Sequence, residues 1–249
     1  MSSPNGYIRS ELDGDVLRVA LNRPEVRNAQ TPQMWQHLVQ IAESVSPQTR
    51  FVVLTGQGVD FSAGLDRSVL ADTGPEGMIA ALQGDPEAFI TTAQRAFRAW
   101  SELPQVVIAA VQGNVIGAGF QLALASDVLI AAPSARFALR ETSIGLVPDL
   151  GGTGALIDSI GYRRTFALCA TGAFLSAQDA AAAGLVHTMD EDLTSAVESI
   201  LATLRGVDAG SLADLKKLLR AVAHDLDSWG DERRIQVQRL QSLFGQVRS

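Results

Sequence analysis

The sequence contains few of the residues that define disulfide-rich proteins and metalloproteins. Its one cysteine, Cys169, excludes a disulfide within the chain and fits a reducing compartment, and the apolar helical pattern around it indicates a buried, inert thiol. The three histidines, His37, His187 and His224, lie far apart and have no HxxxH or CxxC companion. We therefore expect no bound metal.

Long apolar runs are also missing. No run approaches the ~20 residues that a membrane-spanning helix needs, and the first residues, MSSPNGYIRSELDGD, lack the apolar region of a secretory signal peptide. We therefore expect a cytoplasmic protein. A net charge of −7 argues against non-specific binding of nucleic acid, but it allows a local basic patch for an anionic ligand. With 47% hydrophobic and 19% charged residues the chain is globular, and 249 residues allow one or two domains.

Motifs of nucleotide-binding proteins and serine hydrolases are absent or incomplete. The chain has no GxxxxGK[ST] phosphate loop, and a dinucleotide-binding fingerprint would need a third glycine where Leu122 stands. It also has no GxSxG, which argues against a serine nucleophile.

What the chain does contain is an alternation of apolar strand and helix patterns broken by Gly and Pro. Asp13-Gly14 marks a hairpin, Thr31-Pro32 begins a helix that Pro47 closes, and Gly161 breaks a long helix. Residues 71–86, with three glycines and two prolines around a short apolar patch, indicate a mobile or variable loop. The predicted strands are 7–11, 16–22, 51–55, 106–111, 128–131, 137–138 and 185–189. The other predicted helices are one from Phe120 and those at 87–103, 151–160, 162–171, 176–183, 192–204, 211–223 and 231–247. These patterns alone predict an α/β protein.

One stretch, residues 106–127 (VVIAAVQGNVIGAGFQLALASD), combines a strand, a glycine-rich turn and a helix. Gly113, Gly117 and Gly119 separate the apolar run from the helical pattern that begins at Phe120. This order leaves backbone N–H groups free at a helix start, where they can bind an anion or stabilise an oxygen that becomes negative. Such glycines often serve only a tight turn or close packing, so the oxyanion interpretation needs a second donor.

A candidate for the second donor follows the apolar run at 51–55. There Gly56 opens the loop at 57–66 (QGVDFSAGLD), in which the small residues Ala63 and Gly64 allow another chain or a ligand to approach closely. If the two strands are neighbours, their two loops can direct two N–H groups at one oxygen.

Four stretches resemble the enoyl-CoA hydratase/isomerase, or crotonase, superfamily in order and spacing: NRPEVRNA at 22–29, FSAGLD at 61–66, VQGNVIGAGFQLALASD at 111–127 and FALRETSIGLVPDLGGT at 137–153. The resemblance implies a spiral of repeated ββα units that form two roughly perpendicular sheets. Residues 1–190 are then the core with an acyl-CoA site. Residues 191–249 are a helical region that covers the site and forms trimers, often paired into hexamers.

The resemblance also implies an acyl-CoA thioester as substrate, with coenzyme A as part of that substrate and no other cofactor. The N–H groups of Leu65 and Ala118 occupy the family's oxyanion positions. Other residues are implied at the substrate and CoA site: Arg27, Ala29, Ala63, Gly64, Asp66, Gly117, Gln121 and Pro148. Arg27 would lie near the CoA phosphates, although a solvated arginine is the alternative, and Asp66 would cap a helix after the oxyanion loop.

Proton transfer near the thioester requires a carboxylate. Hydratases of this family carry one glutamate two residues after the GxG turn, where this chain has Gln121, which cannot transfer a proton but can hold a water or orient a partner. Glu141 matches the second hydratase glutamate, and Asp149 falls where some isomerases of the family carry their single acid. By themselves, Glu141 could equally pair with a surface arginine and Asp149 could cap the next helix.

Three functions follow from this set of residues. The first is an enoyl-CoA isomerase in which Asp149, helped or replaced by Glu141, carries the proton of a thioester enolate. The second is a hydratase that uses Glu141 alone while Gln121 places the water. The third is an acyl-CoA-binding protein without turnover.

Overall fold

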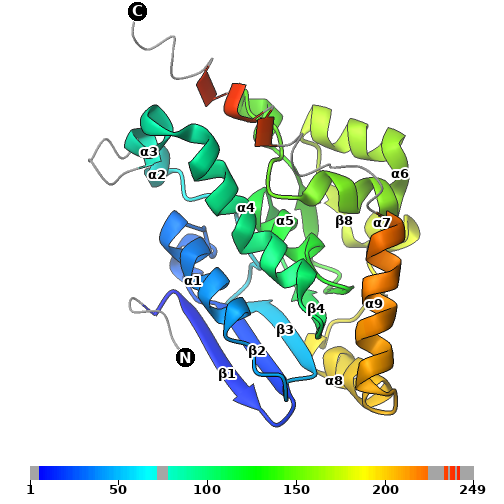
Figure 1. The fold of residues 1–249 in the computed structure, drawn as a ribbon. Helices are drawn as coiled ribbons and strands as arrows, with labels where there is room; N and C mark the ends of the chain where they lie inside the picture. The colour runs from blue at the N-terminus through cyan, green and yellow to red at the C-terminus, as the bar shows by residue number, and fades with distance from the viewer. Residues whose placement is uncertain (1–5, 72–77, 224–232, 235, 239, 242–249) are drawn as a thin grey trace, which may run out of the picture.

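The main sheet of the protein consists of six strands, and a computed structural model describes it within residues 6–71, 78–223, 233–234, 236–238 and 240–241 (Figure 1). Its strand order is β1-β2-β3-β4-β6-β9, with β1 antiparallel to β2 and every later pair parallel. The strands are β1 (Ile8–Asp13), β2 (Val16–Leu21), β3 (Phe51–Gly56), β4 (Val106–Val111), β6 (Val128–Ala131) and β9 (Thr188–Met189). The six predicted strands of this sheet are therefore confirmed, although β9 is shorter than expected.

Strand β4 is the centre of the core. All six of its residues are buried, as its continuous apolar run predicted, because a parallel strand is covered on both faces. Strands β3 and β6 flank it, so the loops after β3 and β4 leave the same edge of the sheet. This neighbourhood is what brings the two glycine-bearing loops together.

A second sheet contains three short strands, β5 (Asn114–Ile116), β7 (Arg136–Ala138) and β8 (Leu175–Ser176). Strand β7 was predicted, but β5 and β8 were not. Strand β5 lies inside the glycine-rich stretch, between Gly113 and Gly117, and it forms because residues 136–138 pair with it in parallel. Two or three residues carry too little pattern to indicate a strand whose partner is distant in sequence.

The helices of the N-terminal half cover one face of the main sheet (Figure 1). Helix α1 (Pro32–Glu43) begins as predicted, with the Thr31 side chain accepting a hydrogen bond from the Met34 N–H at 3.3 Å. Helix α4 (Pro86–Glu102) packs against α1, where the rings of Trp35 and Phe97 meet edge to face. Helix α5 (Ala118–Leu124) follows the glycine-rich turn and is buried in the core.

The prediction of a loop at 71–86 is wrong for part of that segment. The structure has helices α2 (Ser68–Ala71) and α3 (Met78–Gly84), while residues 72–77 lie outside the described part of the chain. Helix α3 is stabilised by tertiary packing, because Leu82 is buried in a small apolar cluster with Ile90 and Leu146. Within its short apolar patch Leu82 is buried, whereas Ile79 and Ala80 are half-buried and Ala81 is exposed.

The C-terminal part is helical as predicted. Helix α6 (Gly152–Thr171) contains the predicted break, since Gly161 has φ 76° and ψ 159°. Helices α7 (Ala177–Ala182), α8 (Leu193–Arg205) and α9 (Ala209–Ala223) follow. Asp127 holds α9 to the core through Lys216 and Arg220 at 2.7 and 2.9 Å. Most of the helix predicted at 231–247 lies outside the described residues. No helix in the described ranges has both the length and the hydropathy needed to cross a bilayer.

Candidate active site

The loop at 61–66 connects two parts of the fold. Ser62 pairs with Val115 of β5, and Leu65 forms an isolated parallel bridge with Gln30. In that bridge the Gln30 N–H donates to the Gly64 carbonyl at 2.7 Å, and the Asp66 N–H donates to the Gln30 carbonyl at 2.8 Å. Because the neighbours of Leu65 supply these partners, the N–H of Leu65 itself is directed away from Gln30.

The Gly117 turn packs directly against this loop. A Cβ atom at Gly64 would lie 2.7 Å from the Ile116 carbonyl oxygen and 3.6 Å from the Ala118 nitrogen. A Cβ atom at Gly119 would lie 2.5 Å from the Cβ of Ser62. These glycines therefore allow the close approach that the sequence suggested. Within the described residues, the N–H groups of Leu65 and Ala118 donate no hydrogen bond to the chain.

Glu141 is the carboxyl group nearest to this turn. It is the first residue of a short 3-10 helix, Glu141–Ile144, and its Oε1 would lie 3.4 Å from a Cβ atom at Gly117. Its Oε2 is buried and has no hydrogen-bond partner among the described residues. Burial raises the pKa of Glu141 from its ordinary value of 4.5 to about 7, since the charged form loses its hydration. Among the residues that the structure describes, Glu141 therefore forms no ion pair with an arginine.

Gln121 joins Glu141 to the start of helix α6. Its Nε2 donates to Oε1 of Glu141 at 3.0 Å, and its Oε1 accepts from the N–H groups of Leu150 and Gly152 at 2.8 and 3.3 Å. The side chain is 1% exposed. Of the two roles predicted for Gln121, the geometry favours orienting a partner, because its carbonyl oxygen is already occupied by the backbone.

Asp149 lies on the loop that precedes α6, next to Leu150. The residue is buried, and its main-chain carbonyl accepts a hydrogen bond from Nε2 of Gln94 at 2.7 Å. Gln121 therefore contacts both acid-bearing segments, Glu141 directly and the Asp149 loop through Leu150. The structure thus brings the Glu141 carboxyl and the backbone that follows Asp149 to opposite ends of one carboxamide, and Pro148 precedes Asp149 in the chain.

Three of the residues predicted at the substrate and CoA site, Arg27, Ala29 and Asp66, lie in the 61–66 loop or in the segment that contacts it. Arg27 has a left-handed backbone (φ 55°), its carbonyl accepts from the Ala63 N–H at 2.8 Å, and its side chain is 68% exposed. The carbonyl of Ala29 accepts from Arg23 at 2.6 Å. The side chain of Asp66 accepts from the N–H and hydroxyl of Ser68, just before α2, as the predicted cap would.

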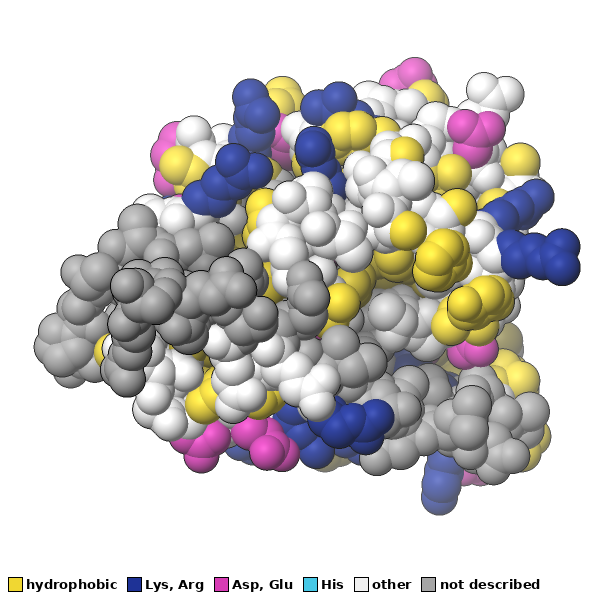
Figure 2. Space-filling view, turned by 90° about the horizontal axis from the view of Figure 1, so that it is seen from above, with side chains coloured by type: hydrophobic (Ala, Val, Ile, Leu, Met, Phe, Trp, Pro, Cys, Tyr) yellow, Lys and Arg dark blue, Asp and Glu magenta, His cyan; other side chains and the backbone are white. Residues whose placement is uncertain are grey.

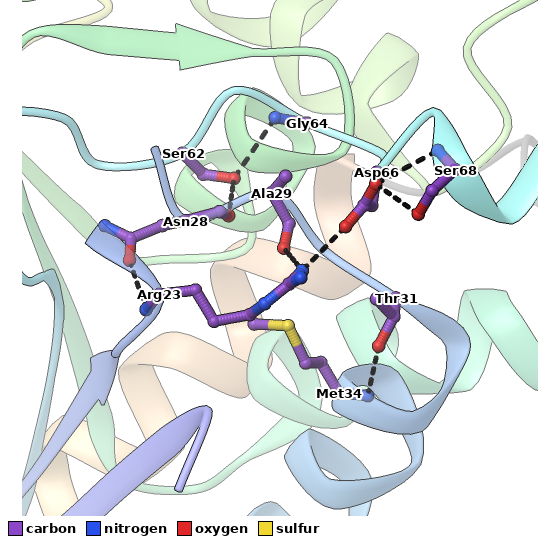
Figure 3. Close-up of polar contacts among 9 residues, drawn as sticks. All are labelled: Arg23, Asn28, Ala29, Thr31, Met34, Ser62, Gly64, Asp66 and Ser68. Atoms are coloured by element: carbon purple, nitrogen blue, oxygen red, sulfur yellow. Dashed lines mark hydrogen bonds and ion pairs between the residues drawn. The ribbon is translucent and has the colours of Figure 1, made fainter. Parts of the chain in front are cut away.

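Sequence reasoning missed several residues that fix this loop, and Figure 3 shows them. The hydroxyl of Ser62 donates to the Asn28 carbonyl at 2.8 Å and accepts from the Gly64 N–H at 3.2 Å. Arg23 forms an ion pair with Asp66 at 2.9 Å. Arg23 lies in the motif NRPEVRNA, but nothing in its local pattern indicates a partner 43 positions later.

A separate hollow of about 570 Å³ lies between α5, the start of α6 and α9. Gln121 contributes to its wall, together with Leu124, Leu150 and Lys216, but Leu65, Ala118 and Glu141 do not. We therefore place the candidate site at the Gly64 and Gly117 loops. The described residues contain no cluster of three His, Cys, Asp or Glu side chains suited to a metal ion.

Comparison with known proteins identifies relatives of one family, as the four sequence motifs predicted. The model of the enoyl-CoA hydratase/isomerase family matches residues 11–249. The chain is 35% identical over 192 residues to 1,2-epoxyphenylacetyl-CoA isomerase of Escherichia coli K12, covering 76% of this chain and 72% of that protein. It is 36% identical over 182 residues to 2,3-dehydroadipyl-CoA hydratase of the same organism, covering 72% and 68%. A Thermobifida fusca protein described as an enoyl-CoA hydratase, solved with acetoacetyl-CoA, has a TM-score of 0.82 at 32% identity and covers 96% of this chain and 95% of its own.

Proposed function

Because this chain belongs to the enoyl-CoA hydratase/isomerase family, we propose that it shifts a double bond in an enoyl-CoA through a thioester enolate. The family and the crotonase fold imply an acyl-CoA substrate, and acetoacetyl-CoA is the ligand in the similar Thermobifida fusca structure. Isomerases and hydratases both occur among the relatives, so the choice of reaction depends on the residues at the site.

The enolate oxygen would be stabilised by the N–H groups of Leu65 and Ala118. Removal of a proton next to the thioester carbonyl places negative charge on that oxygen, and fixed donors lower the barrier only if they are in place beforehand. Two observations support this assignment: the two loops are in van der Waals contact, and neither N–H is used inside the described part of the chain. In enzymes, one such donor contributes roughly 3–4 kcal/mol to the stability of the transition state.

Glu141 is the group we assign to proton transfer, and its environment is the observation that carries the proposal. It is a buried carboxyl with a pKa of about 7, one oxygen held by Gln121 and the other without a partner among the described residues. Isomerisation takes a proton from one carbon and returns it to another, so one carboxylate is sufficient. Hydration must also place and deprotonate a water, and the neutral Gln121 stands where a second acid would serve.

Asp149 remains the second candidate for the proton carrier, since its segment reaches the same carboxamide through Leu150. A hydratase that uses Glu141 alone is the second candidate function, supported by the identity to a hydratase over 72% of the chain. Binding of acyl-CoA without turnover is the third possibility.

Parallel assays of a 3-enoyl-CoA and a 2-enoyl-CoA test the proposal. We expect migration of the double bond at least 10-fold faster than formation of a 3-hydroxyacyl-CoA. In deuterium oxide, a single carboxylate that returns the proton it removed should leave part of the original hydrogen in the product. Faster hydration would establish the hydratase instead. Acyl-CoA binding measured by calorimetry with neither product would establish the binding protein.

We also propose that the chain assembles as a trimer or as a dimer of trimers. Helix α6 exposes Ile157, Tyr162 and Phe166, and the last two rings are stacked at 6.1 Å. Figure 2 shows hydrophobic side chains on the side of the molecule where α6 lies. Helix α9 exposes Leu218 and Leu219. Exposed apolar groups of this number support an interface, and light scattering on the purified chain would measure the mass of the assembly.

A further inference from the structure

A partly buried ion pair joins Arg23 to Asp66, at the end of the loop that carries Leu65 (Figure 3). One nitrogen of the guanidinium, Nη1, donates to Oδ2 of Asp66 at 2.9 Å and to the carbonyl of Ala29 at 2.6 Å. The two charged side chains are only 12% and 16% exposed. Water and salt therefore screen their attraction weakly, unlike that of a surface pair.

The ion pair spans the bridge that orients Leu65. Gln30 bonds to the residues on both sides of Leu65, through the Gly64 carbonyl and the Asp66 N–H. Arg23 contacts Ala29, which precedes Gln30, and Asp66, which follows Leu65. The Arg23 guanidinium thus links the segment before Gln30 to the residue after Leu65. These two segments form the bridge that sets the direction of the Leu65 N–H.

Both partners of the pair are themselves held in place. The guanidinium lies 4.6 Å from the centre of the Tyr7 ring, and the Arg23 N–H donates to Oδ1 of Asn28 at 2.8 Å. The second carboxylate oxygen of Asp66 accepts from the N–H and hydroxyl of Ser68 at 3.0 and 2.7 Å. Because each side chain is anchored at both ends, a movement of either one is transmitted to the loop between them.

We propose that Arg23 and Asp66 are positioning residues that hold the N–H of Leu65 at the place of the developing thioester oxygen. This inference rests on the proposed enolate reaction. The pair acts through the backbone of residues 64–66 and carries no proton. Since a displacement of about 1 Å in a reacting geometry can cost on the order of 100-fold in rate, loss of the pair should lower kcat by about 10- to 100-fold and leave KM within about 3-fold.

Asp66→Asn and Arg23→Lys test the inference against a matched control, Asp127→Asn. Asp127 also pairs with partly buried cations, Lys216 and Arg220, but these pairs join α9 to the core and do not contact the 61–66 loop. The decisive readout is the infrared stretching frequency of the thioester carbonyl in a bound, ¹³C-labelled acyl-CoA, because hydrogen-bond donors lower it. We expect the carbonyl frequency of bound acyl-CoA to be lower than that of free acyl-CoA in the wild type and in Asp127→Asn. In Asp66→Asn and Arg23→Lys we expect the frequency to return part of the way to the free value, together with the fall in kcat.

The outcomes distinguish a failure of the proposed enolate stabilisation from a failure of the positioning role of Arg23 and Asp66. If the wild type does not lower the carbonyl frequency, the enolate-stabilising role of Leu65 and Ala118 fails. If the wild type lowers it and Asp66→Asn retains both the full frequency change and the kcat of Asp127→Asn, the pair is merely structural and the inference is overturned. If Asp66→Asn does not fold, Arg23→Lys is the deciding variant, because it keeps the positive charge. A carbonyl frequency and a kcat equal to those of the wild type in Arg23→Lys would overturn the inference.

Discussion

Asp66, in the 61–66 loop, and Glu141, next to the Gly117 turn, are two largely buried carboxyl groups with opposite surroundings. Asp66 accepts hydrogen bonds from Ser68 and faces Arg23, and these contacts hold its pKa below the ordinary value. Burial raises the pKa of Glu141 to about 7, and within the described residues its side-chain donor is the neutral amide of Gln121. The Asp66 carboxylate is charged at neutral pH because its pKa is lowered, whereas Glu141 can gain or lose a proton near neutral pH.

The comparison shows how one fold can use buried carboxylates for two purposes. A carboxylate that is matched with a cation and with N–H donors remains charged and fixes the chain around it. A carboxylate without a cation is poised between its two protonation states, which suits a general base. The groups that contact a buried carboxyl therefore determine whether it holds the chain in place or transfers a proton.

The largest effect that would sharpen this comparison is expected for Glu141→Gln. The amide keeps the size of the side chain but cannot accept a proton, so kcat for double-bond migration should fall by roughly 100- to 10,000-fold. The matched variant, Asp149→Asn, should lose less than about 10-fold. Steady-state assays on a 3-enoyl-CoA measure both, and a reversed order would assign the proton to Asp149.

The next effect concerns stability on the Asp66 side. Arg23→Met leaves Asp66 withdrawn from water without its cation, which should lower the free energy of unfolding by about 3 kcal/mol. Arg98→Met, at the exposed pair with Glu102, should change it by less than about 0.5 kcal/mol. Urea denaturation followed by circular dichroism gives both values. Equal losses would show that the Arg23 pair is no stronger than a surface pair.

A third effect concerns the pH dependence of stability on the Glu141 side. The folded state holds the Glu141 proton more tightly than the unfolded chain does, because its pKa is about 7 instead of 4.5. The contribution of this group is therefore greatest below pH 4.5 and declines as the pH rises through 7. Between pH 5 and 8 the wild type should lose up to about 3 kcal/mol relative to Glu141→Gln, at ~1.4 kcal/mol per pKa unit. A constant difference between the two proteins would contradict the raised pKa.

The smallest effect is a shift in the pH profile of activity. Because the base must be ionised, kcat/KM should rise with pH and reach half its maximum near pH 7. Gln121→Glu places a second carboxyl within about 3 Å of the first, and two such groups cannot both ionise easily, so the midpoint should rise by about one pH unit. Gln48→Glu, at an exposed position, serves as the control. An unmoved midpoint in Gln121→Glu would mean that Glu141 does not set the profile.

The sequence by itself determined the local framework of the protein. Thr31 and Pro32 fixed the start of α1, the run at 106–111 fixed the buried strand β4, and Gly161 fixed the break in α6, because each depends on neighbours along the chain. The motif residues Leu65, Ala118 and Glu141 could be named for the same reason, since they stand at set positions in short family patterns.

The tertiary structure decided what those residues meet. Strands β5 and β8 form by pairing with β7, and α3 forms because Leu82 is buried against elements elsewhere in the chain. The pairing of Arg23 with Asp66 joins segments that are distant in sequence. The burial that raises the pKa of Glu141 likewise depends on segments that only the folded core brings together. Burial and charge pairing depend on distances in space, and no local pattern of residues records them.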